Sequence, residues 1–122
     1  MRRGANYLIN KVALWSREDW GVDVQEGMDD ITLALVADAW SRTGRVSVRA
    51  ESASPGTARL RSGMPIAVDA ARLDAPRLPL APALKPLQQL DRSLCEIEQR
   101  FGAARREWVV LEMEYSDAPG CI

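Results

Sequence analysis

Apolar side chains recur at helical spacing in the last third of the chain. They stand three and four residues apart, at Leu87, Leu90, Leu94, Ile97 and Phe101, which places them along one face of a helix. Pro86 suits the first position of such a helix, and Gly102 suits the position just past its end. The pattern therefore predicts a helix that follows Pro86 and ends at Phe101.

A second helical repeat follows directly, with Ala104, Trp108, Leu111 and Tyr115 on its apolar side. Two apolar faces joined by a tight turn predict an antiparallel helical hairpin over residues 87–116. We expect Trp108 in the core of this hairpin. Burying the five apolar side chains of the first helix is worth roughly 7–15 kcal/mol before chain entropy is counted, so the hairpin is expected to anchor the fold.

Helical spacing also marks the N-terminal part of the chain. Leu8, Val12 and Trp15 lie four and three residues apart and share one helical face. They predict a helix over residues 5–20, which Gly21 is expected to end.

A second N-terminal helix is predicted to begin at Asp29 or Asp30 and to stop near Thr43. Either carboxylate can accept hydrogen bonds from the free N–H groups of the first turn. The apolar side of this helix is expected to hold Ile31, Ala34, Leu35, Ala37 and Trp40. The two helices together occupy residues 5–43.

The period changes over residues 44–75. Val46 and Val48 alternate with polar residues, which is typical of a strand with one face in water. Residues 52–56 have the composition of a turn. The segments 57–60 and 66–68 fit partner strands of a small β-hairpin, and an extended loop over the helices is the alternative.

Prolines at positions 76, 79, 82 and 86 exclude a helix between residues 76 and 86. We predict an extended proline-rich strap whose Leu78, Leu80 and Leu84 pack against the body; a flexible linker is the alternative.

The whole chain is thus predicted to be a single domain over residues 1–122. Its expected class is mainly α, with α+β as an alternative. It has four helices that include the C-terminal hairpin, and a small β-hairpin or extended loop in the middle.

Charge is unevenly distributed along a chain whose net charge is only -1. Residues 42–77 hold seven arginines and three acids, a net charge of +4. This arginine segment predicts a contact surface for phosphates or an acidic protein, with Arg42, Arg45, Arg49, Arg59 and Arg61 as its candidate contact residues. The alternative is that these arginines pair with acidic residues of the same chain, because a small domain keeps all its charges close together.

Residues 18–38 supply those acids, with seven carboxylates and no lysine or arginine. Such a segment can be a solvated loop with helix-capping aspartates, or it can imitate a nucleic-acid backbone. Trp20 lies within it and is a candidate partner anchor, since tryptophan is frequent at binding hot spots; packing in the core is its alternative role.

Catalytic chemistry is sparse in this sequence, which contains no histidine. The commonest general base and metal ligand are therefore missing, and no phosphate-binding glycine loop is present. We expect no enzyme activity, no metal and no cofactor.

Cys95 and Cys121 are expected as a buried thiol and a tail thiol, although a disulfide between them is possible. No apolar run fits a signal peptide or a membrane span, so we expect a cytoplasmic protein that does not contact a membrane.

Two C-terminal stretches, Leu90–Leu94 and Arg105–Tyr115, resemble a known helical hairpin. It precedes the DNA-reading module in the late-gene antiterminators of lambdoid phages, the small Q-type proteins, and in their autolysin-regulator relatives. The matching positions are Asp91, Leu94, Arg106, Val110, Leu111 and Tyr115. The segment from Trp15 to Trp20 is similar to a paired-tryptophan segment near the start of such proteins. In that family a helix-turn-helix follows the tyrosine, whereas seven residues follow Tyr115, so the resemblance implies docking onto a protein complex rather than sequence-specific DNA binding.

These observations predict a small phage-type regulatory protein that binds a host macromolecule, with RNA polymerase or a promoter complex as the expected partner. Nucleic acid is a further possible partner through the arginine segment. One alternative is an inhibitor of a host defence or nuclease complex, of the anti-CRISPR kind, acting through the acidic segment. Another is a structural module that forms oligomers through its helical faces.

Overall fold

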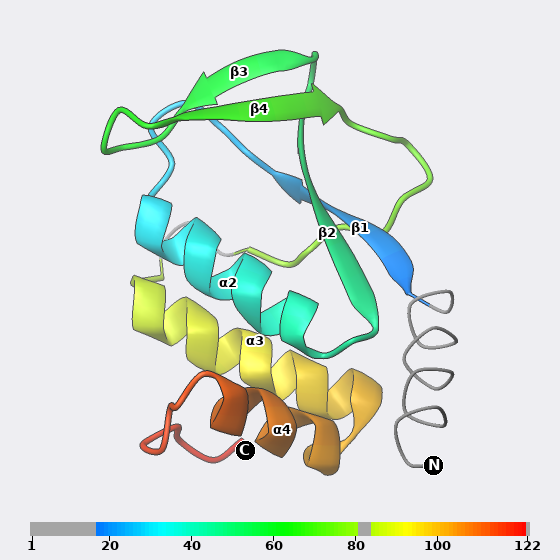
Figure 1. Ribbon diagram of the computed structural model, residues 1–122, viewed down its shortest axis with the longest axis vertical. Helices are drawn as coiled ribbons and strands as arrows, with labels where there is room; N and C mark the ends of the chain where they lie inside the picture. Colours follow the sequence, from blue (N-terminus) through cyan, green and yellow to red (C-terminus); the bar gives the residue numbers. More distant parts are fainter. Residues whose placement is uncertain (1–16, 81–83, 122) are drawn as a thin grey trace, which may run out of the picture.

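The computed structural model describes residues 17–80 and 84–121 (Figure 1). Its elements follow the order β1 (Glu18–Asp23), α2 (Asp30–Arg42), β2 (Val46–Ser52), β3 (Gly56–Arg59), β4 (Pro65–Ala70), α3 (Pro86–Phe101) and α4 (Ala103–Glu112). The described part is therefore an α+β structure with three helices and four strands, and the prediction of a mainly α fold with four helices is wrong.

The four strands form one mixed sheet in the order β1-β2-β4-β3. Strands β1 and β2 are parallel and are joined by α2, because parallel strands need a crossover connection. Strand β4 joins β2 in parallel only at Glu51–Asp69 and Ser52–Ala70. Strands β3 and β4 form the antiparallel hairpin that the middle of the sequence predicts.

Strand β1 replaces the end of the helix predicted over residues 5–20. Trp20 and Val22 alternate with Asp19, Gly21 and Asp23, so the local period is two rather than 3.6. Gly21 lies inside the strand and does not end a helix. Residues 5–16 of the predicted helix lie outside the described residues.

The three helices lie together on one side of the sheet, with α2 against the sheet and α3 and α4 beyond it (Figure 1). Trp20 of β1 stacks on Trp40 of α2 with 5.2 Å between ring centroids, and Phe101 contacts Trp40 edge-on. The guanidinium of Arg100 lies 4.5 Å from the Trp20 ring centroid. Trp20 is only 4% exposed, so it is a core residue and not an exposed anchor.

Helix α2 begins and ends where the sequence predicts. The Asp29 carboxylate accepts from the N–H groups of Ile31 and Thr32, and Thr43 closes the other end. Trp40 is buried as predicted, but the other buried residues of the helix are Leu33, Val36 and Ala39 rather than the predicted ones, and Ile31 is 61% exposed.

The predicted C-terminal hairpin is confirmed, with Pro86 in the first turn of α3 and Gly102 between the helices. Gly102 has a φ of 96°, a conformation that favours glycine. The predicted face of α4 is wrong, because Val109 is buried whereas Trp108 and Leu111 are 50% and 72% exposed. Helix α4 carries apolar residues on two sides, so its periodicity could not select the buried one.

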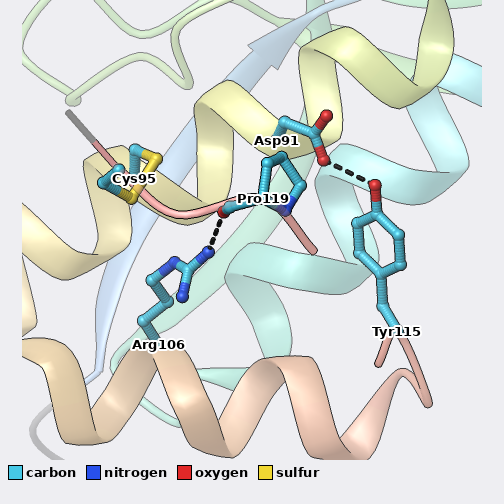
Figure 2. Close-up of a disulfide and its surroundings, with 6 residues drawn as sticks. Asp91, Cys95, Arg106, Tyr115 and Pro119 are labelled. Atoms are coloured by element: carbon cyan, nitrogen blue, oxygen red, sulfur yellow. Dashed lines mark hydrogen bonds between the residues drawn. A yellow bond between two sulfur atoms is a disulfide. The ribbon is translucent and has the colours of Figure 1, made fainter. Parts of the chain in front are cut away.

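The C-terminal tail returns across α3 and is covalently fixed there (Figure 2). Cys95 of α3 and Cys121 form a disulfide, so the expectation of two separate thiols is wrong. The Tyr115 hydroxyl donates to Asp91 at 2.7 Å, and Arg106 donates to the Pro119 carbonyl at 2.6 Å. These two hydrogen bonds hold the tail in place against the helical hairpin (Figure 2).

The proline-rich strap is extended from residue 76 to 80, and its last predicted residue, Pro86, already belongs to α3. Gly21 of β1 donates to the Pro76 carbonyl, and Leu78 donates back to the Gly21 carbonyl, at 2.9 Å each. The strap therefore lies beside β1, on the side away from β2, and Leu78 is buried as predicted.

Candidate functional site

The arginine segment is largely neutralised by the acidic segment of the same chain. Arg42 pairs with Asp38 at 2.9 Å, and Arg61 pairs with Asp29 at 2.9 Å. Two further pairs join Arg72 to Asp19 and Arg77 to Asp23. This pairing agrees with internal neutralisation, the alternative reading of the charge pattern, and it occupies Arg42 and Arg61 among the candidate contact residues.

The other three candidate arginines are exposed. The guanidinium of Arg59 donates to the Gly63 carbonyl at 3.1 Å. Over residues 17–80 and 84–121, Arg45 and Arg49 form no ion pair with another described side chain. Arg45 directly precedes β2, and Arg49 lies within β2 four residues later. The two side chains therefore lie on the same side of that strand.

Glu51 forms a buried ionic cluster that the sequence analysis missed. Its side chain is fully buried, and its carboxylate accepts from Arg72 Nε at 2.6 Å and from Arg77 Nη1. Arg77 also donates to Asp23. Burial alone would raise the pKa of Glu51, but the hydrogen bonds from Arg77 and Arg72 outweigh it and hold that pKa below its ordinary value.

Gly21 makes room for this cluster on the side of the sheet away from the helices. A Cβ at that position would lie 2.0 Å from Oε1 of Glu51 and 2.1 Å from Nη1 of Arg77. The signals available in the sequence were a single acid in a strand of the arginine segment and a glycine in the neighbouring strand. The cluster fixes the strap to the sheet through Arg77.

A cavity of about 590 Å³ lies beside the strap, at the carboxyl end of β1 and the start of α2. One wall is apolar and the other carries charged groups from the loop before α2. The lining residues are Asp23, Gln25, Glu26, Gly27, Met28, Asp29, Thr32, Arg61, Leu78, Leu80, Leu84, Lys85 and Pro86.

The carboxylates of the cavity are held in place by contacts with the protein. Asp29 caps α2 and pairs with Arg61, while Glu26 accepts the Arg59 N–H at 2.9 Å. Asp23 accepts from Arg77. Each contact leaves lone pairs on the carboxylate, because a carboxylate has about four acceptor positions. The arrangement can therefore receive a donor group at one wall and an apolar group at the other.

The sequence predicted roles for some of these residues without bringing them together. It predicted that Leu78, Leu80 and Leu84 pack against the body, and it named Arg61 as a contact residue. It interpreted Asp23 and Glu26 only as members of a charged segment. The cavity depends on the strap crossing beside β1, a long-range contact that local spacing does not encode.

Among the helices of the described residues, none combines the length and apolar character that a bilayer crossing requires. No protein-family model matches the sequence, and no curated protein matches it either. The antiterminator resemblance is therefore wrong. Its residues Asp91 and Tyr115 instead form a hydrogen bond that fixes the tail of an α+β domain.

The structure is similar to the crystal structure of an AraC family transcriptional regulator from Pseudomonas putida. The TM-score is 0.65, and the match covers 79% of this chain and 99% of that chain. The sequences are 9% identical over the match, so the similarity concerns the fold.

Proposed function

We propose that this protein is a regulatory protein, of the kind that controls transcription, and that it acts by binding a small effector in the cavity beside the strap. The fold it shares with a transcriptional regulator supports the regulatory class. The sequence contains no histidine, which favours binding without turnover.

The cavity is the observation that carries this proposal. Its volume of about 590 Å³ falls within the range of roughly 300–1,000 Å³ that small-molecule sites occupy. It combines an apolar wall with a few polar groups that are already oriented by hydrogen bonds, which is typical of such sites.

The lining also indicates the class of effector. The lining contains three carboxylates, from Asp23, Glu26 and Asp29, and two cationic side chains, from Arg61 and Lys85. Arg61 is paired with Asp29. An effector with a cationic group and a short apolar body would place its charge near Asp23 and Glu26 and its body against Leu78 and Leu80.

A series of n-alkylamines from butylamine to octylamine tests this site. We expect these amines to raise the Tm of the protein, with an affinity that increases by about 0.8 kcal/mol per buried methylene until the cavity is full. The matched n-alkylcarboxylates should have little effect. Glu26→Gln should weaken binding of the amines, while Glu96→Gln, on α3 and paired with Arg92, should not.

Equal effects of amines and carboxylates on the Tm would contradict the proposed site. So would a Glu26→Gln protein that binds the amines as tightly as the wild type does. The chain-length dependence separates cavity binding from surface binding, because a carboxylate cluster on the surface responds to charge but not to the apolar tail.

A second candidate function is favoured by Arg45 and Arg49, two neighbouring exposed arginines that no described carboxylate neutralises. They are suited to contact nucleic-acid phosphates. We expect Arg45→Ala/Arg49→Ala to reduce the slope of log affinity against log salt by about 1.8 in fluorescence anisotropy with duplex DNA. The matched double variant Arg61→Ala/Arg92→Ala removes two arginines that are already paired and should leave the slope unchanged. An unchanged slope in the first variant would exclude this function.

A further inference from the structure

A second hollow, separate from the cavity beside the strap, lies between α2 and the β3–β4 hairpin. This groove has a volume of about 490 Å³. Its walls are almost entirely apolar and include Leu33, Ala34, Val48, Ala50, Leu60 and Ile66. Met64 also lines the groove and is 57% exposed, so its side chain faces water at the rim of the groove, whereas Leu33 and Leu60 are buried in its floor.

Helix α4 presents a second uncovered apolar surface. Ala104, Trp108 and Leu111 lie on the outer side of the helix, at positions i, i+4 and i+7, and all three are exposed. Trp108 and Leu111 are 50% and 72% exposed. Helices that dock into apolar grooves use anchors at this spacing.

We propose that the groove binds helix α4 of a second copy of this chain, with Trp108 and Leu111 as the anchors. Each copy carries both a groove and a matching helix face, and both surfaces are uncovered in the described part of one molecule. Trp108 supplies the type of large aromatic side chain that dominates protein interfaces. This inference goes beyond effector binding and does not depend on the cavity beside the strap.

Charges at the edges of the two surfaces support this pairing. Asp30 and Asp38 lie on the α2 side of the groove; Asp38 is paired with Arg42, whereas Asp30 accepts hydrogen bonds from Ser62 and has no cation partner among the described residues. Arg105 flanks the anchors on α4, and among the described residues it has no carboxylate partner. Glu107 flanks the anchors on the opposite side, and Glu112, on the side of Arg105, is already paired with Arg42 of the same chain, so Arg105 is available to Asp30 of the groove.

The interface joins two different surfaces, so a dimer still has one free groove and one free α4 face. Such an association continues to larger species unless it closes into a ring. This property distinguishes it from a symmetric contact in which α4 packs against α4.

Sedimentation equilibrium over micromolar to millimolar protein tests the proposal. We expect the average mass of the wild-type protein to increase with concentration. Trp108→Glu should abolish the increase by removing the anchor. Ala34→Arg should abolish it by filling the groove, since Ala34 is exposed and the new arginine can pair with Asp30 and Asp38 along the helix.

Mixing the two variants gives the decisive result. Trp108→Glu keeps an intact groove and Ala34→Arg keeps an intact α4, so an equimolar mixture should form a dimer of one copy of each and nothing larger. Leu73→Glu, at a fully exposed position, is the charge control and should associate like the wild type. If circular dichroism shows that Trp108→Glu or Ala34→Arg does not fold, Leu111→Glu replaces the former and Met64→Arg the latter.

Three results would overturn the proposal. The first is a wild-type protein that stays monomeric at every concentration. The second is a mixture that remains monomeric while the wild type associates, which would assign α4 to a symmetric contact. The third is a monomeric wild-type protein that trypsin cleaves after Lys11 more slowly than it cleaves the Ala34→Arg variant. This result would mean that residues 1–16 of the same chain occupy the groove.

Discussion

Glu51 shows how one residue joins distant parts of this chain. A fully buried carboxylate is costly unless its charge is matched, and here two arginines from later segments supply the match. Arg72 follows β4, and Arg77 belongs to the strap. The carboxylate therefore fixes the connection between β4 and α3 to the middle of the sheet at two points, and removing either arginine would leave a buried charge only partly compensated.

Gly21→Ala tests the space that this cluster needs. The new methyl group would overlap Oε1 of Glu51 and Nη1 of Arg77, so one of these groups must move. We expect the free energy of unfolding to fall by about 2 kcal/mol, measured by urea denaturation. Gly120→Ala is the matched control, because a Cβ there meets no atom within 4 Å. Equal stability of the two variants would show that the cluster tolerates the displacement.

At the scale of the element, the tail after α4 depends on a disulfide. Cys95 and Cys121 are separated by 26 residues, and closing a loop of this length restricts the unfolded chain by roughly 3 kcal/mol. Cys121→Ser should therefore lower the free energy of unfolding by about that amount. Reduction of the wild-type protein with dithiothreitol should give the same stability as the variant, and a variant as stable as the oxidised wild type would contradict this account.

Elements with a single strong pattern could be predicted from the sequence, and those with two competing patterns could not. Helix α3 has one apolar face, and its proline and glycine mark both ends, so its bounds were correct. Helix α4 has apolar residues on opposite sides, and only packing against α3 selects Val109. Strand β1 was misassigned because the helical repeat of Leu8, Val12 and Trp15 was extended as far as Gly21, while pairing with β2 stabilises the extended form from Glu18 onward.

The candidate site was predictable only in its parts. Its leucines, its acids and Arg61 were each recognised as notable residues of their own segments. Their convergence requires the strap to lie beside β1 and Arg61 to reach Asp29, contacts between residues that are more than thirty positions apart. Short-range spacing carries no information about contacts of this range.

At the scale of the whole molecule, stability is expected to pass through a maximum with pH. The pKa of Glu51 is held below its ordinary 4.5, where the hydrogen bonds from Arg77 and Arg72 overcome burial. The pKa of Asp30 is held below 3.8 by hydrogen bonds from the Ser62 hydroxyl and N–H. Because both values are lowered on folding, their stabilisation is present above the ordinary values and is lost as the pH falls below them.

Tyr115 defines the opposite limb of this profile. Its hydroxyl donates to Asp91, and with burial this raises the pKa of Tyr115 above 10.0. The folded state then holds the phenolic proton more tightly than the unfolded chain does. Its contribution to stability is therefore complete below pH 10.0, the ordinary pKa, and is lost as the pH rises above it. Urea midpoints between pH 3 and 11 should show both limbs. Glu51→Gln should flatten the acid limb and Tyr115→Phe the alkaline limb, and a variant with unchanged slopes would exclude its residue as the cause.

The strap also determines which associations remain open to this molecule. Without it, β1 would expose a row of free backbone groups that an extended segment of another chain could extend into a growing fibre. Pro76 and Pro79 have no N–H to offer, and they flank the short stretch that pairs with Gly21. Backbone pairing with another chain is thus hindered at this border of the sheet, and β3, the edge strand at the opposite border, is where an extended segment of another chain could still add.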